Sequence, residues 1–146
     1  MSQEKDIAKH YKRKQIESSS PGKLIVMLYE KAIEHLDNAE EAINGKNLDR
    51  IESFHNSVIT CQNIITELTV SLDIENGGDV ANNLFRLYDF MNYRLVDSNI
   101  RKDTKALDEV RGLLKTLKSG WEQVQDAPIP EDKLDNVKRK GFNIQG

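Results

Sequence analysis

The sequence predicts an all-α fold: an antiparallel up-down-up-down four-helix bundle with an N-terminal segment packing on it. Apolar residues recur at alternating steps of three and four in four separate stretches, which is the spacing of one face of an α-helix. The connections between the stretches are short, and short loops favour antiparallel neighbours. The chain of 146 residues is 38% hydrophobic and 31% charged, a composition that suits a single helical domain.

The first helix is predicted over residues 21–44. Ser20 is a suitable N-cap, and Pro21 suits the first helical position because its missing N–H is not needed there. Gly45 stands where a left-handed residue commonly ends a helix. The apolar series of this helix is Ile25, Leu28, Ala32, Leu36, Ala39 and Ile43.

The second and third helices flank a polar turn, Asp73–Asp79, which contains two adjacent glycines. The series of the second helix is Ile51, Phe54, Val58, Cys61, Ile65, Leu68 and Leu72. The series of the third is Ala81, Leu84, Tyr88, Met91 and Leu95.

The fourth helix follows a connection at Asn99–Asp103, in which Asp103 is a candidate cap. Its series is Leu107, Val110, Leu114, Leu117, Trp121 and Val124. Pro128 and Pro130 cannot continue a helix. We therefore expect an N-terminal cap or lid segment over residues 1–20, the four-helix bundle over 21–125, and a flexible C-terminal tail over 126–146.

Charge and composition argue against several classes of partner. The net charge is −3, so no overall basic field attracts nucleic acid. The longest apolar run has six residues, far short of the ~20 that span a membrane, so no membrane insertion is expected. The first residues lack the apolar core of a signal peptide, and one cysteine permits no internal disulfide. A cytoplasmic protein is the expected class.

No motif in the sequence predicts catalysis, a cofactor or a metal. Glu52 and His55 have the Glu-x-x-His spacing of di-iron bundles, but they lie beside the core series and no second copy exists. The Gly22-Lys23 pair lacks the first glycine of a phosphate-binding loop. Cys61 lies in a core series, where a buried thiol is inert. The protein is therefore not expected to be an enzyme.

Many apolar residues lie outside the four series, and a helix that is apolar on all sides must be covered. Part of this surplus can be absorbed by a core that is wider than four stripes. The rest predicts an interaction surface, covered either by the N-terminal segment, through Tyr11 and Ile16, or by a second polypeptide. The surplus on the four helices includes Leu24, Val26, Met27, Tyr29, Ile33, Ile64, Leu87 and Phe90.

Four passages carry a family resemblance. The pattern Y-x-x-x-x-I-x-x-S-S-P-x-x-L-x-x-M-L-Y-E over residues 11–30 resembles the opening motif of the FliS-type flagellar secretion chaperones. The passages IITELTVSLD (64–73) and GGDVANNLFRLYDFMNYRLVDSN (77–99) resemble the family's second and third helices. The passage LDEVRGLLKTLKSGWEQV (107–124) resembles the fourth. The residues after Pro130 have no counterpart in this pattern.

The resemblance implies an export chaperone that binds the disordered C-terminal segment of flagellin in the cytoplasm, prevents its premature polymerisation and assists its delivery to the flagellar export apparatus. Other flagellar export or regulatory proteins are further possible partners, and the free protein is expected to be a monomer or a weak homodimer. The alternative is a helical adaptor for another secretion or regulatory client. The expected flagellin-binding residues are Tyr11, Ile16, Leu24, Val26, Met27, Ile33, Ile64, Leu68, Leu72, Leu87 and Phe90.

Overall fold

The computed structural model describes residues 21–126, which form four helices: α2 (Pro21–Asn44), α3 (Arg50–Val70), α4 (Ile74–Arg101) and α5 (Lys105–Asp126). The all-α fold predicted from the apolar spacing is confirmed. The predicted bounds of the first helix agree with those of α2. Ser20, its expected N-cap, lies outside the described residues.

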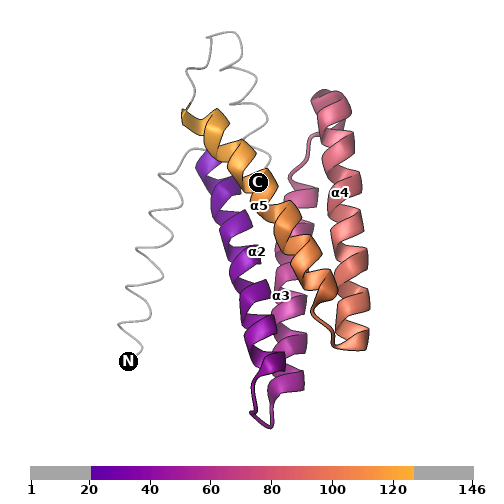
Figure 1. Cartoon of the computed structure of the whole chain (residues 1–146). Helices are drawn as coiled ribbons and strands as arrows, with labels where there is room; N and C mark the ends of the chain where they lie inside the picture. The colour runs from indigo at the N-terminus through magenta and orange to yellow at the C-terminus, as the bar shows by residue number, and fades with distance from the viewer. Residues whose placement is uncertain (1–20, 127–146) are drawn as a thin grey trace, which may run out of the picture.

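The helices form a four-membered ring in which each helix packs mainly on two others. α2 contacts α3 and α5, and α4 contacts the same two helices from the opposite side. Successive helices run in opposite directions, so that α2 begins and α5 ends at the same end of the bundle (Figure 1). α5 runs obliquely, from the end of α4 towards the beginning of α2.

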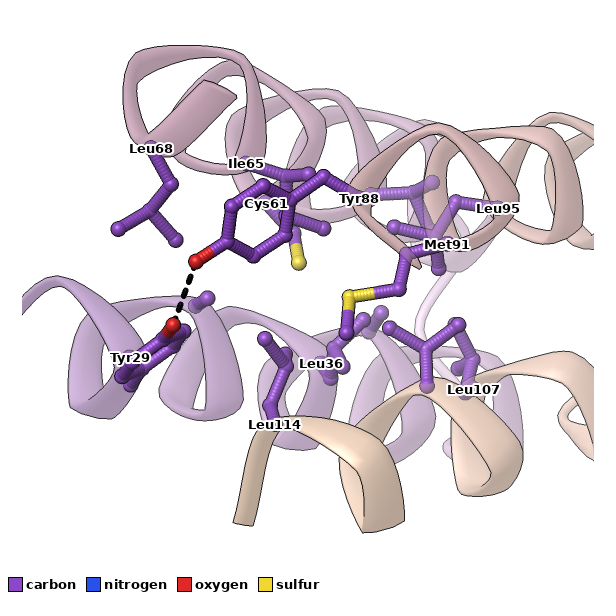
Figure 2. Close-up of a cluster of buried hydrophobic side chains, with 14 of the residues drawn as sticks. Tyr29, Leu36, Cys61, Ile65, Leu68, Tyr88, Met91, Leu95, Leu107 and Leu114 are labelled. Carbon is purple, nitrogen blue, oxygen red and sulfur yellow. Dashed lines mark hydrogen bonds between the residues drawn. The ribbon is translucent and has the colours of Figure 1, made fainter. Parts of the chain in front are cut away.

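The core lies between the four helices and contains residues from each of them (Figure 2). The predicted series of the second helix supplies Phe54, Val58, Cys61, Ile65 and Leu68, all at most 1% exposed. The largest fully buried side chains on the other helices are Tyr29, Leu36, Tyr88, Met91, Leu95, Leu107, Val110 and Leu114. The 3-4 spacing therefore located most of the core.

The predictions for five residues are wrong. Tyr29, expected among the surplus, is completely buried, and Leu24 and Val26 are also buried. Ile51, expected in the core, is 51% exposed because it lies in the first turn of α3, at the end of the bundle. Gly45 does not adopt the left-handed conformation; instead its N–H donates to the carbonyl of Ala42 (3.2 Å), which tightens the last turn of α2.

α4 starts within the stretch that was predicted as a turn. The carboxylate of Asp73 caps it by accepting hydrogen bonds from the backbone N–H (3.1 Å) and the side-chain amide (3.0 Å) of Asn76. The predicted turn chemistry persists as a kink at Gly78, whose φ of 59° and ψ of −139° interrupt the helix. Such a conformation is readily accessible only to glycine.

The other end of α4 has the left-handed cap that was expected after α2. Lys102 adopts φ 56° and ψ 42°, and its N–H donates to the carbonyl of Ser98 (2.7 Å). Asp103 follows, and its carboxylate accepts a hydrogen bond from the N–H of Lys105 at the start of α5 (3.1 Å), as its predicted capping role requires. No helix in the described part of the chain is long and apolar enough to cross a membrane.

Candidate protein-binding surface

The exposed large apolar side chains are distributed unevenly over the bundle. Among the described residues there are eleven: Leu48 in the connection before α3; Ile51, Ile59 and Val70 on α3; and Ile74, Val80, Phe85, Phe90, Tyr93, Val96 and Ile100 on α4. None lies on the described parts of α2 or α5. Contiguous exposed apolar surface of this kind marks interaction sites in proteins, so α4 is the first candidate.

α4 has apolar side chains on every side, with exposed polar residues such as Arg86 and Asp89 between them. Its inner side buries Tyr88, Met91 and Leu95 in the core. The side next to α3 is identified by two hydrogen bonds: the Gln62 amide donates to the carbonyl of Asn92 (3.4 Å), and the Asn99 amide meets the imidazole of His55 (2.9 Å).

Helical spacing places four more apolar residues of α4, two along the α3 boundary and two on the outer side of the helix. Phe85 and Val96 are seven and four residues from Asn92, which places them along the α3 boundary. Tyr93 and Ile100 are seven residues apart on the outer side, and they are 70% and 77% exposed. A helix with this composition needs a covering partner.

The boundary between α4 and α5 is identified by the ion pair of Arg94 with Glu109 (3.0 Å). Leu87 and Phe90 lie on the same side of α4 as Arg94, seven and four residues before it. Leu113 and Leu117 follow Glu109 at four and eight residues on α5. We call the side chains along this boundary the α4/α5 seam; they are Leu84, Leu87, Phe90, Leu113, Leu117 and Trp121, all half-buried except Phe90, which is 41% exposed.

The seam contains residues that the sequence did not suggest as contacts. Leu117 and Trp121 were expected to lie inside the bundle, yet both are only partly buried against the core cluster. Leu113 lies outside the four predicted core series. The spacing of Leu113 and Leu117 after Glu109 was the available signal, but it becomes meaningful only once Glu109 is known to face α4.

The expected flagellin-binding residues do not form one surface. Leu87 and Phe90 lie together in the seam, while Leu68 is in the core and Leu72 packs partly against it. Leu24 and Val26 are buried, and Met27 is half-buried. Tyr11 and Ile16 lie outside the described residues.

Ile33 and Ile64 are half-buried against the core on other sides of the bundle. Ile64 follows Gln62, which faces α4, by two residues, so it points away from α4. Ile33 lies between the ion pairs that connect α2 to α5 and lines a pocket there.

This pocket between α2 and α5 has a volume of about 460 Å³ and a mostly charged lining: Glu30, Ile33, Glu34, Asp37, Lys115, Lys118, Ser119 and Glu122. Lys118 pairs with both Glu30 (3.5 Å) and Glu122 (3.4 Å). The exposed large apolar side chains on the described helices thus lie on α3 and α4, away from this charged pocket.

Arg111 joins the same two helices next to the pocket. Its guanidinium binds the carboxylates of Asp37 (2.8 Å), Glu40 (2.6 Å) and Asp108 (2.6 Å). Burial alone would lower the pKa of Arg111, but the hydrogen bonds to Asp108 and Glu40 outweigh this effect and raise the pKa. The guanidinium is therefore permanently charged and fixes the register of α5 on α2.

The buried polar groups are arranged for stability. The hydroxyl groups of Tyr29 and Tyr88 share a hydrogen bond of 2.5 Å inside the core (Figure 2). Burial raises the pKa of both phenols, and it raises the pKa of the Cys61 thiol to about 12. All three are neutral near pH 7. Within residues 21–126, no cluster of three or more His, Cys, Asp or Glu side chains could hold a metal ion.

Comparisons with known proteins point to one family. A family model described as Flagellar protein FliS matches residues 3–128. The chain is 37% identical to the flagellar secretion chaperone FliSB of Pseudomonas aeruginosa over 110 residues, covering 75% of this chain and 85% of the relative. It is 38% identical to the flagellar secretion chaperone FliS of Salmonella typhimurium, covering 73% of this chain and 78% of the relative.

A more distant relative and a solved structure agree with these matches. The flagellar secretion chaperone FliS of Bacillus subtilis is 32% identical over 113 residues, covering 77% of this chain and 81% of the relative. A crystal structure of a bacterial flagellar chaperone superposes with a TM-score of 0.67 at 21% identity, covering 84% of this chain and 98% of the other. At that identity the structural match supports the fold.

Proposed function

Because this chain belongs to the FliS family of flagellar secretion chaperones, we propose that it binds the disordered C-terminal segment of flagellin in the cytoplasm. Binding covers the apolar residues of that segment, prevents premature polymerisation and keeps the subunit ready for the flagellar export apparatus. The chaperone itself contributes a surface and no chemistry.

One observation supports this proposal most strongly: α4 carries seven of the eleven exposed large apolar side chains of the described chain, and they lie on more than one of its sides. A flat docking partner would cover one side of a helix. A disordered segment can instead follow the α4/α5 seam, cross the outer side at Tyr93 and Ile100, and reach the α3 boundary at Val96. The distribution of apolar residues thus favours an extended client.

Several of the contact residues on α4 are only partly exposed. Phe85, Phe90 and Val96 are between 41% and 48% exposed, so each offers a client only part of its apolar area. The ordering of a flexible client further reduces the net binding free energy. A broad surface of partial contacts suits a chaperone that must release its client for export.

Calorimetric titration of the full chain with a synthetic peptide of the flagellin C-terminal segment tests the proposal. We expect a 1:1 complex, also visible by size exclusion, with a negative heat-capacity change because apolar surface is buried. The matched control is a peptide of the same composition in scrambled order. If neither peptide binds, the proposal is wrong, and the alternative of a helical adaptor for another secretion client gains support.

A further inference from the structure

The α2/α5 pocket has more carboxylates than cations. Its lining contains four carboxylates and two lysines around the half-buried Ile33. Lys118 is shared between two carboxylates and Arg111 among three, while Glu34 also pairs with Lys31 (3.2 Å) at the exposed rim. Because each carboxylate has two oxygens that accept several hydrogen bonds, these groups retain capacity for further cations. The pocket therefore combines an apolar residue with an unbalanced negative charge.

The same imbalance holds for the whole bundle. Residues 21–126 contain 18 acidic and 12 basic side chains, whereas residues 131–146 contain three acidic and four basic ones. Three of those four are consecutive: Lys138, Arg139 and Lys140. The family match ends at residue 128, so this basic run belongs to a part of the chain to which the family relationship assigns no role.

The position of the pocket favours this segment as its occupant. α5 ends at Asp126, four residues after Glu122, which lines the pocket. Lys115, at the far end of the lining, is about 17 Å from the end of α5 at 1.5 Å per helical residue. The twelve residues from Asp126 to Lys138 span up to about 40 Å when extended. A connection of this length is long enough for the basic run to meet any carboxylate of the pocket.

We infer that residues 131–146 fold back onto the bundle and occupy the α2/α5 pocket. In an extended segment alternate side chains share one side, so Lys138, Lys140 and Phe142 face the pocket together. The two ammonium groups pair with the carboxylates of Glu30 and Glu34, and the phenyl ring covers Ile33.

Tethering makes weak contacts sufficient for this occupancy. A short tether gives an effective concentration in the millimolar range, so ion pairs that are individually weak at partly exposed sites are sufficient. The contact is electrostatic, so salt weakens it. It lies away from α4, and the inference holds whether or not the client is flagellin.

A nitroxide label near the C-terminus of the full chain tests the inference. Gln145→Cys provides the attachment site, while Cys61 remains unlabelled because it is buried and its pKa is about 12. We expect the amide NMR signals of residues 30–37 and 115–122 to lose most of their intensity, and those of residues 85–100 to keep theirs. About 0.5 M salt should restore the lost signals, because the screening length is then only a few Å.

The chain contains a matched control, since Lys12, Arg13 and Lys14 form an identical basic run near the other terminus. Reversing Lys138, Arg139 and Lys140 to glutamate should restore the signals, whereas reversing residues 12–14 to glutamate should not. Uniform intensities in the labelled chain would overturn the inference, as would losses centred on α4. Restoration by the residue 12–14 variant alone would assign the pocket to the N-terminal segment instead.

Discussion

Phe90→Ser tests how one side chain divides its apolar area between the bundle and the client. A phenylalanine side chain buries about 200 Å² when completely covered. Since Phe90 is 41% exposed, about 80 Å² remains for a client, which corresponds to about 2 kcal/mol at 25 cal/mol per Å². We therefore expect the substitution to raise the Kd for the flagellin C-terminal peptide by about 30-fold.

The buried part of the same side chain contributes to folding. It covers about 120 Å², so the free energy of unfolding should fall by at most about 3 kcal/mol. A domain of this size tolerates such a loss. Calorimetric titration and urea denaturation of the same sample measure the two effects separately.

Leu48→Ser is the matched control. Leu48 is completely exposed, in the connection between α2 and α3, so neither the Kd nor the free energy of unfolding should change. If Phe90→Ser lowers stability but leaves the Kd unchanged, Phe90 belongs to the bundle alone and the α4/α5 seam does not bind the client.

Three further predictions concern stability. Gly78→Ala should lower the free energy of unfolding by about 1–3 kcal/mol because alanine is strained at φ 59°, ψ −139°. Gly112→Ala is the control: this glycine lies inside α5 with open space around it, so the substitution should raise the free energy of unfolding by up to about 1 kcal/mol. Equal effects of the two substitutions in urea denaturation would contradict the kink at Gly78. Arg111→Met should lower the free energy of unfolding by about 1–3 kcal/mol, and by less at high salt, because three carboxylates lose their shared partner. Arg101→Met is the control: Arg101 pairs with Asp97 but is 68% exposed, so the loss should be at most about 0.5 kcal/mol. Similar losses for the two variants would show that Arg111 does not hold α5 on α2. Between about pH 9 and 10 the free energy of unfolding should also fall, with a slope that approaches about 1.4 kcal/mol per pH unit, because the unfolded Cys61 thiol ionises at its usual pKa of 9.0 whereas the folded state holds it protonated. Above about pH 10 the phenols of Tyr29 and Tyr88, whose pKa values burial also raises, steepen the fall. Cys61→Ala should flatten the slope below about pH 10, and an unchanged slope there would show that the thiol is not responsible.

The periodicity of the sequence was sufficient for the fold because each core series is long and regular. Phe54, Val58, Cys61, Ile65 and Leu68 are spaced as one helical stripe, and all of them are buried. The same method failed where apolar residues are consecutive. In the run Leu24–Tyr29 every possible stripe contains apolar side chains, so spacing could not identify Tyr29 as a core residue.

The candidate surface was harder to predict because exposure depends on how helices approach one another. Leu117 and Trp121 continue the core series of α5, yet they are partly exposed in the α4/α5 seam. Ile33 and Phe90 both lie outside the core series, but Ile33 faces a charged pocket and Phe90 an apolar seam. Neighbours that are distant in sequence, such as Lys118 beside Ile33 and the α5 residues that follow Glu109 beside Phe90, create this difference.

The central claim, that the client is bound on α4, is tested most directly by amide NMR of the full chain during titration with the flagellin C-terminal peptide. The account predicts the largest chemical-shift changes at residues 80–100 of α4 and at residues 113–121 of α5. It also predicts no change in the connection at residues 46–49. Shift changes confined to α2 and the outer side of α5, with those of α4 unaffected, would contradict it.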